Sequence, residues 1–164
     1  MKDSLKLSPR GDRELVMTRI FEAPRAMVFD AFTKPELVRQ WLLGPPGWSM
    51  PVCEIDLRVG GRYRYVWRHE NGNEMGMGGE FREIVVPERI ISTERFDRSW
   101  YPGEAVGTIE LAEKAGKTTL TQIVRYDSPQ ALEAVLKSPM ESGVVASYNR
   151  LEELLASKQL ASKP

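Results

Sequence analysis

The side chains best suited to acid–base chemistry in this sequence are carboxylates on predicted strands. Glu54 and Asp56 alternate at i and i+2 and therefore share a strand face, while Glu80, Glu83 and Glu94 lie on neighbouring strands. A carboxylate that is turned into an apolar cavity has a raised pKa and can act as a general base. The alternative is that these groups form surface salt bridges with nearby arginines, namely Arg62, Arg64, Arg82 and Arg95.

The other reactive residue types are scarce. The single histidine, His69, lies beside a predicted hairpin tip, which is a poor position for a Ser-His-Asp arrangement. The single cysteine, Cys53, lies in a predicted strand, where a buried structural thiol is the expected interpretation. One histidine and one cysteine far apart cannot build a typical zinc site of four nitrogen or sulfur ligands. We therefore predict no metal site, no cofactor and no catalytic set.

The glycine-rich segment 76–79 does not have the features of a phosphate-binding loop. It lacks the Lys-Ser/Thr ending of such a loop, and no helix is predicted after it. Glycines inside a strand more often mark a bulge, or a place where a bulky group lies against the backbone.

Large aromatic side chains and methionines are concentrated between residues 41 and 101. They could fill a core, but buried Trp and Tyr need partners for their polar tips, whereas methionine adapts to varied ligands. The second interpretation is a ligand cavity, to which the C-terminal helix would add further residues. The predicted cavity residues are Trp41, Trp48, Tyr63, Tyr65, Trp67, Met75, Met77, Phe81, Phe96, Met140, Val144 and Tyr148.

The elements that must position these residues begin with a strand over 14–22. Pro24 suits the first turn of a helix, and Thr33 with Glu36 predicts a capping box at the start of a second short helix. Further strands are predicted over 48–57, 62–69, a return strand after the hairpin signal Asn71-Gly72, 89–97, 105–113 and 117–126, the last two joined by a turn at Gly116.

The C-terminal part of the sequence is helical. Ser128-Pro129 opens a short helix through Lys137, and Ser138, Pro139 and Glu141 repeat the capping pattern. An apolar stripe then extends for about 19 residues at helical spacing. Its members are Met140, Val144, Tyr148, Leu151 and Leu155, whereas Glu141, Asn149, Arg150, Glu152 and Glu153 are predicted to lie off the stripe.

These elements predict an α+β fold in which a curved antiparallel sheet of about six to seven strands wraps around a long C-terminal helix. The predicted organisation is a flexible arm over 1–13, one domain over 14–157 and a tail over 158–164. The 164-residue chain suits a single domain.

Since 23 basic residues balance 23 acidic ones, the basic excess of a nucleic-acid binder is absent.

Compartment and assembly follow less directly from the sequence. No run approaches the roughly 20 apolar residues needed to span a bilayer, and the N-terminus has no apolar secretory segment. With a single cysteine, we expect a soluble protein of the reducing cytoplasm. The oligomeric state stays open.

Four groups of residues form a recognisable set of motifs: residues 23–36, Trp41 with Gly44-Pro45, residues 52–63, and Pro87-Glu88-Arg89-Ile90 followed by Thr93-Glu94-Arg95-Phe96. These motifs closely resemble the bacterial members of the family named for the activator of heat-shock-protein-90 ATPase. That family lies within the SRPBCC superfamily, which includes START lipid-transfer domains, birch-pollen-allergen-like proteins and polyketide cyclases. The resemblance extends from about Glu14 to Leu155.

The resemblance implies the helix-grip fold and a cavity between the long helix and the sheet, but it carries over no catalytic residue. The family name comes from a eukaryotic co-chaperone in which this fold is one of two domains. Because only about 13 residues precede the first predicted strand, we do not expect the companion domain here.

Three functions therefore stand as hypotheses. The leading one is the binding of a small lipophilic molecule, with a stress-linked or regulatory role as one option. The second is a chaperone-associated interaction module, which would need a large exposed apolar patch outside the cavity. The third is a cyclase- or hydrolase-like enzyme, which would need a cavity-facing carboxylate with a raised pKa.

Overall fold

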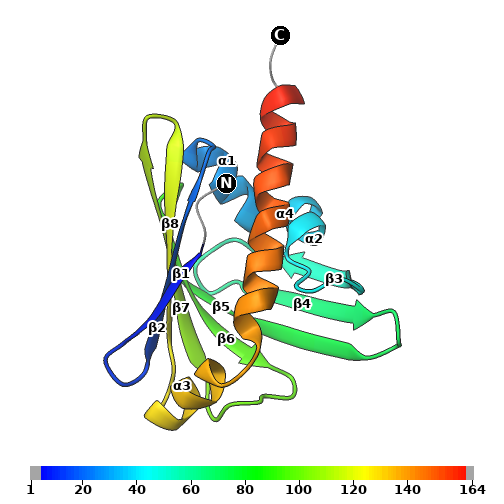
Figure 1. Ribbon diagram of the computed structural model, residues 1–164, viewed down its shortest axis with the longest axis vertical. Coiled ribbons are helices and arrows are strands. Elements are labelled where there is room, and N and C mark those ends of the chain that lie inside the picture. The colour runs from blue at the N-terminus through cyan, green and yellow to red at the C-terminus, as the bar shows by residue number, and fades with distance from the viewer. Residues whose placement is uncertain (1–4, 162–164) are drawn as a thin grey trace.

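One curved antiparallel sheet forms the body of the protein in this computed structural model, which describes residues 5–161 (Figure 1). Within those residues eight strands follow the order β1-β2-β8-β7-β6-β5-β4-β3. The strands are β1 (Lys6–Arg10), β2 (Glu14–Phe21), β3 (Trp48–Ile55), β4 (Arg62–His69), β5 (Glu74–Val85), β6 (Arg89–Phe96), β7 (Ala105–Lys114) and β8 (Lys117–Arg125).

Four helices accompany the sheet in the described part of the chain: α1 (Arg25–Thr33), α2 (Pro35–Trp41), α3 (Pro129–Leu136) and α4 (Met140–Ala161). Figure 1 shows the long α4 lying across the concave side of the sheet, with α1 and α2 near one end and α3 near the other. The predicted α+β class, the helix-grip arrangement and the two short helices after the first long strand are confirmed. No helix within residues 5–161 is long and apolar enough to cross a membrane.

The sheet has one strand more than predicted. Residues 6–10, assigned from sequence to a flexible arm, pair with β2 and cover its otherwise open edge. This strand is short, mostly exposed and contains Pro9, which an edge strand tolerates. At the other end, α4 continues to Ala161, so residues 158–161 of the predicted tail are helical. Residues 1–4 and 162–164 of the predicted terminal segments lie outside the described part of the chain.

The predicted capping boxes at Thr33 and Ser138 are wrong, whereas the cap at Ser128 is confirmed. Ser128 accepts a hydrogen bond from the Ala131 N–H at 3.1 Å. Thr33 is still the last residue of α1, and its hydroxyl donates to the Phe29 carbonyl one turn earlier. The Ser138 hydroxyl likewise donates backwards, to Val135. Serine and threonine at a helix end can satisfy either terminus, and sequence spacing does not decide which.

The hairpin at Asn71-Gly72 is confirmed, but its turn is not type I′. Only Gly72 has a positive φ, 96°, and the His69 N–H donates to the Asn73 carbonyl across a three-residue loop. The Asn71 side chain accepts from the Asn73 N–H, which holds this longer loop. The pair of positive φ angles that a type I′ turn needs occurs instead between β7 and β8, at Ala115 (54°) and Gly116 (77°).

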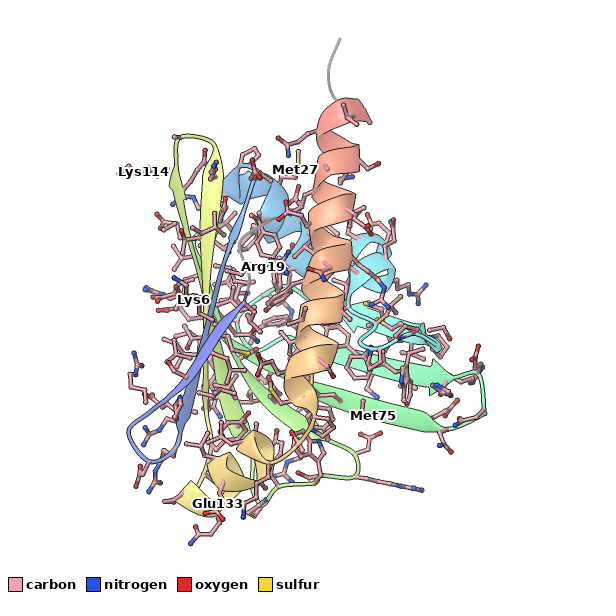
Figure 2. All side chains as sticks on the ribbon, viewed as in Figure 1. Lys6, Arg19, Met27, Met75, Lys114 and Glu133 are labelled. Atoms are coloured by element: carbon pink, nitrogen blue, oxygen red, sulfur yellow. The ribbon has the colours of Figure 1, made fainter. Side chains whose placement is uncertain are left out.

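A buried polar cluster joins α4 to the sheet. Arg19 on β2 donates to Asn149 Oδ1 at 2.9 Å, and its Nη2 lies 3.8 Å from Glu152 Oε1. Figure 2 shows Arg19 between β2 and α4. Glu152 was predicted to lie off the apolar stripe, but it is buried because its charge has a partner on the facing strand. Helical periodicity alone cannot identify that partner.

The backbone of Gly79 on β5 lies so close to Thr93 and to the Tyr63 ring that it fixes the position of this cavity-facing ring. A Cβ at Gly79 would lie 1.9 Å from the Thr93 carbonyl oxygen and 2.9 Å from the Tyr63 ring. The Tyr63 hydroxyl donates to that same carbonyl at 2.7 Å. The glycine therefore leaves the space in which a bulky ring lies against the strand, as one of the two interpretations of segment 76–79 predicted.

Gly79→Ala should lower the free energy of unfolding by at least about 2 kcal/mol, because the added methyl overlaps backbone that cannot move aside. Gly107→Ala on β7 is the matched control, since its Cβ would make only an ordinary 3.5 Å contact. Urea denaturation of both variants would measure the difference. Equal stability of the two variants would contradict the account of Tyr63 placement.

Candidate functional site

A cavity of about 640 Å³ lies between the concave face of the sheet and the N-terminal half of α4. On that half of the helix the residues lining the cavity include Gly143, Val144 and Ser147. One to two turns further on, Leu151 and Leu155 are fully buried in the core. The small side chains at Gly143, Val144 and Ser147 therefore leave space beside the helix, whereas the two leucines fill it.

All twelve residues predicted to line a cavity lie in its wall. The register of β4 and β5 brings five of them close together: Tyr65 and Trp67 lie opposite Met77 and Met75, and Tyr63 lies opposite Gly79. The strand alternation used for the prediction thus has the correct parity. That these residues bind a ligand remains a prediction.

Two buried tryptophans have their polar tips bonded to backbone. Trp67 Nε1 donates to the Leu42 carbonyl at 2.7 Å, and Trp41 Nε1 donates to the Ala31 carbonyl at 2.9 Å. These bonds satisfy the indole N–H groups and fix the rings in the wall. The cavity therefore presents mainly apolar ring surface in this region.

Glu94 is the only charged side chain among the described residues that line the cavity. It lies on β6, where Ile90, Ser92 and Phe96 also line the wall. These four residues are spaced two apart and therefore share one face of the strand. Sequence reasoning included Glu94 among five candidate carboxylates but did not place it in the cavity. The apolar residues at 90 and 96 on the same strand face were the available signal.

The environment of Glu94 is apolar and aromatic. Burial raises the pKa of its carboxyl to about 7. All five tyrosines of the chain line the same cavity. Burial, followed by smaller contributions that include the negative charge of Glu94, raises the pKa of each of them, so they remain protonated at neutral pH.

Two tyrosine hydroxyls have partners and one does not. Tyr63 donates to Thr93, and Tyr148 donates to the side-chain oxygen of Gln122, which also lines the cavity. The buried hydroxyl of Tyr101 has no hydrogen-bond partner among the described residues. A buried hydroxyl without a partner is uncommon, and a bound molecule would reach this one only after its neighbours move aside.

The other candidate carboxylates do not reach the cavity wall. Glu54 and Asp56 are exposed, Asp56 pairs with Arg58 at 3.0 Å, and Glu83 pairs with Arg89 at 2.8 Å. The expected surface ion pairs thus occur, but with different partners: Arg64 pairs with Asp97, and Arg82 and Arg95 lie 4.0 Å from Glu104.

The single cysteine and the single histidine both pack against other parts of the fold. Cys53 is buried, as predicted, and burial raises the pKa of its thiol to about 11. The His69 ring packs edge-on against Trp48, with ring centres 5.0 Å apart. Within residues 5–161 no group of three or more His, Cys, Asp or Glu side chains is arranged to hold a metal ion.

Glu94 should make stability depend on pH. Between its ordinary pKa in the unfolded chain and about 7 in the folded protein, the folded state binds more protons. The free energy of unfolding should therefore fall by about 1–3 kcal/mol from pH 5 to pH 8, relative to Glu94→Gln, which has no charge to bury. Urea denaturation at both pH values, with Glu54→Gln as an exposed control, would measure it. A parallel pH profile for wild type and Glu94→Gln would exclude a buried, neutral Glu94.

Comparisons with known proteins place this geometry in a family. A family model described as Activator of Hsp90 ATPase homolog 1-like protein matches residues 22–156. A crystal structure from Rhodobacter sphaeroides is 31% identical, with a TM-score of 0.89, covering 94% of this chain and 99% of that one. Among curated proteins no match was found.

Two further crystal structures agree. One from Nitrosomonas europaea is 27% identical with a TM-score of 0.78, covering 93% of this chain and 99% of that one. One from Chromobacterium violaceum is 29% identical with a TM-score of 0.72, covering 88% and 98%. On the family match and these likenesses, the chain belongs to the family of activator of Hsp90 ATPase homolog 1-like proteins.

Proposed function

We propose that the protein binds a small lipophilic molecule in the cavity beneath α4. The observation that carries this proposal is the size of a largely apolar space inside a closely packed fold. If this volume were dry and empty, it would cost roughly 15 kcal/mol at about 24 cal/mol per Å³, which is as much as the whole stability of a typical domain. A lipophilic occupant would remove that cost, whereas ordered water needs more polar partners than this wall offers.

The dimensions suit a drug-sized or lipid-sized molecule. The volume of about 640 Å³ lies within the usual range of roughly 300–1,000 Å³ for small-molecule sites. Met75 and Trp100 line the cavity and are 41% and 42% exposed, which suggests an opening beside them. A molecule could enter there and lie with its apolar part between the aromatic strands and Val144.

The chaperone-associated alternative has less support. A protein-docking surface would present a large continuous apolar patch outside the cavity. Among the described residues the large exposed apolar side chains are divided among several segments: Leu57 and Val59 between β3 and β4, Met75 on β5, Val86 between β5 and β6, Trp100 between β6 and β7, Leu136 on α3 and Leu160 on α4. The family name is the remaining argument for a chaperone partner.

Filling the cavity should abolish binding without unfolding the protein. Val144→Phe adds ring atoms to the wall, whereas Val59→Phe adds the same atoms at an exposed turn and serves as control. Native mass spectrometry of each purified protein, followed by solvent extraction, should recover a lipophilic molecule from wild type and control. At least about tenfold less should come from Val144→Phe at equal thermal stability.

Recovery from Val144→Phe at the wild-type level would contradict binding in this cavity. If no preparation carries a molecule, titration of the protein with fatty alcohols of increasing chain length provides a second test of binding. Tryptophan fluorescence reports occupancy directly, because all four tryptophans line the cavity. Absence of any change with every alcohol would overturn the proposal.

Acid–base catalysis by Glu94 is the second candidate function. A cavity-facing carboxylate with a pKa of about 7 is the observation that favours it, because such a group can both take up and release a proton near neutral pH. Incubation of the recovered molecule with the protein separates the two functions. A pure binder returns it unchanged, whereas an enzyme converts it at a rate that Glu94→Gln removes.

A further inference from the structure

We propose that the occupant of the cavity is a lipophilic amine whose ammonium group is held by Glu94. This inference rests on the binding function proposed above and adds the chemical class of the ligand. It follows from three independent features of the described cavity wall: its single charge, the tyrosine rings around that charge and the hydroxyl of Tyr101.

The first feature is the sign of the charge. Among the described lining residues Glu94 alone is charged, and no Lys, Arg or His shares the wall with it. A fatty acid or a phosphate ester would bring a second negative charge into an apolar space that offers no counter-ion. An ammonium group instead gives the half-buried carboxylate a partner of opposite charge.

The second feature is the aromatic surface near Glu94. Glu94 raises the pKa of all five tyrosines, and four of them form two ring pairs, Tyr63 with Tyr65 and Tyr101 with Tyr126, each with centres 5.1 Å apart. The faces of aromatic rings attract cations, and sites for substituted ammonium groups are commonly built from such rings. A neutral or anionic head group would gain nothing from this surface.

The third feature is the Tyr101 hydroxyl, which is buried without a hydrogen-bond partner among the described residues. Its oxygen is an acceptor, and an ammonium group has several N–H donors to distribute. One ammonium group could therefore pair with Glu94 and, once the neighbours of Tyr101 move aside, also donate to its hydroxyl, which would satisfy both polar groups.

The affinity for an amine should also depend on pH in a defined direction. Glu94 titrates near pH 7 in the empty cavity, and only its ionised form pairs with an ammonium group. The surrounding titratable groups are Tyr63 and Tyr65 of β4, Tyr101 and Tyr126 of the adjoining loops and Tyr148 of α4, and all stay protonated. Amine affinity should therefore rise as the pH passes from 6 to 8, and alcohol affinity should not.

The test compares three probes that share one alkyl chain: dodecylamine, dodecanol and dodecanoate. Tryptophan fluorescence titration of the full chain at pH 8 should show dodecylamine binding at least about tenfold more tightly than dodecanol, and dodecanoate most weakly. Glu94→Gln should remove the preference for the amine while dodecanol binds as before. Glu54→Gln, which removes an exposed carboxylate, should keep the preference.

The possible failures are distinguishable. If none of the three probes binds the wild-type protein, the binding function itself is overturned. If dodecanol or dodecanoate binds as tightly as dodecylamine, the cavity binds lipophiles but the amine inference is wrong. An unchanged amine preference in Glu94→Gln overturns the role of Glu94, and unchanged dodecanol binding by that variant shows that it is folded.

Discussion

The way α4 is held on the concave face of the sheet determines most of the rest of this structure. Leu151 and Leu155 bury the C-terminal half of the helix in the core, and Arg19 of β2 binds Asn149 and Glu152 near the middle of the helix. Nearer the N-terminus of the helix, Gly143, Val144 and Ser147 line the cavity together with Met140 and Tyr148. A helix that is anchored at one end and held away from the strands at the other leaves a cavity between itself and the sheet.

The cavity combines a largely apolar wall with a single acidic group, and the two have opposite physical consequences. Aromatic burial favours an apolar occupant, while the same burial disfavours the charge of Glu94 and raises its pKa. An occupant that is apolar over most of its length and cationic at one end would reconcile both. Tyr101 belongs to the same wall, and its hydroxyl has no hydrogen-bond partner among the described residues.

Sequence alone predicted the sheet, the helices and the cavity wall because strand alternation and helical spacing report which face of an element is buried. Tyr63, Tyr65 and Trp67 illustrate this, since one parity places all three in the wall. It could not predict β1, whose edge position leaves no alternation to read. Glu152 and Glu94 were uncertain for a related reason: the burial of a charge depends on a facing partner or cavity that one-dimensional spacing does not contain.

The most direct test of the account is a high-resolution crystal structure of the protein as purified from its own cells, without added ligand. The account predicts continuous density for one elongated molecule beneath Val144, with its polar end within hydrogen-bond distance of the Glu94 carboxylate. A cavity closed by inward movement of the Tyr63, Tyr65 and Trp67 rings, or filled only by separate ordered waters, would contradict it.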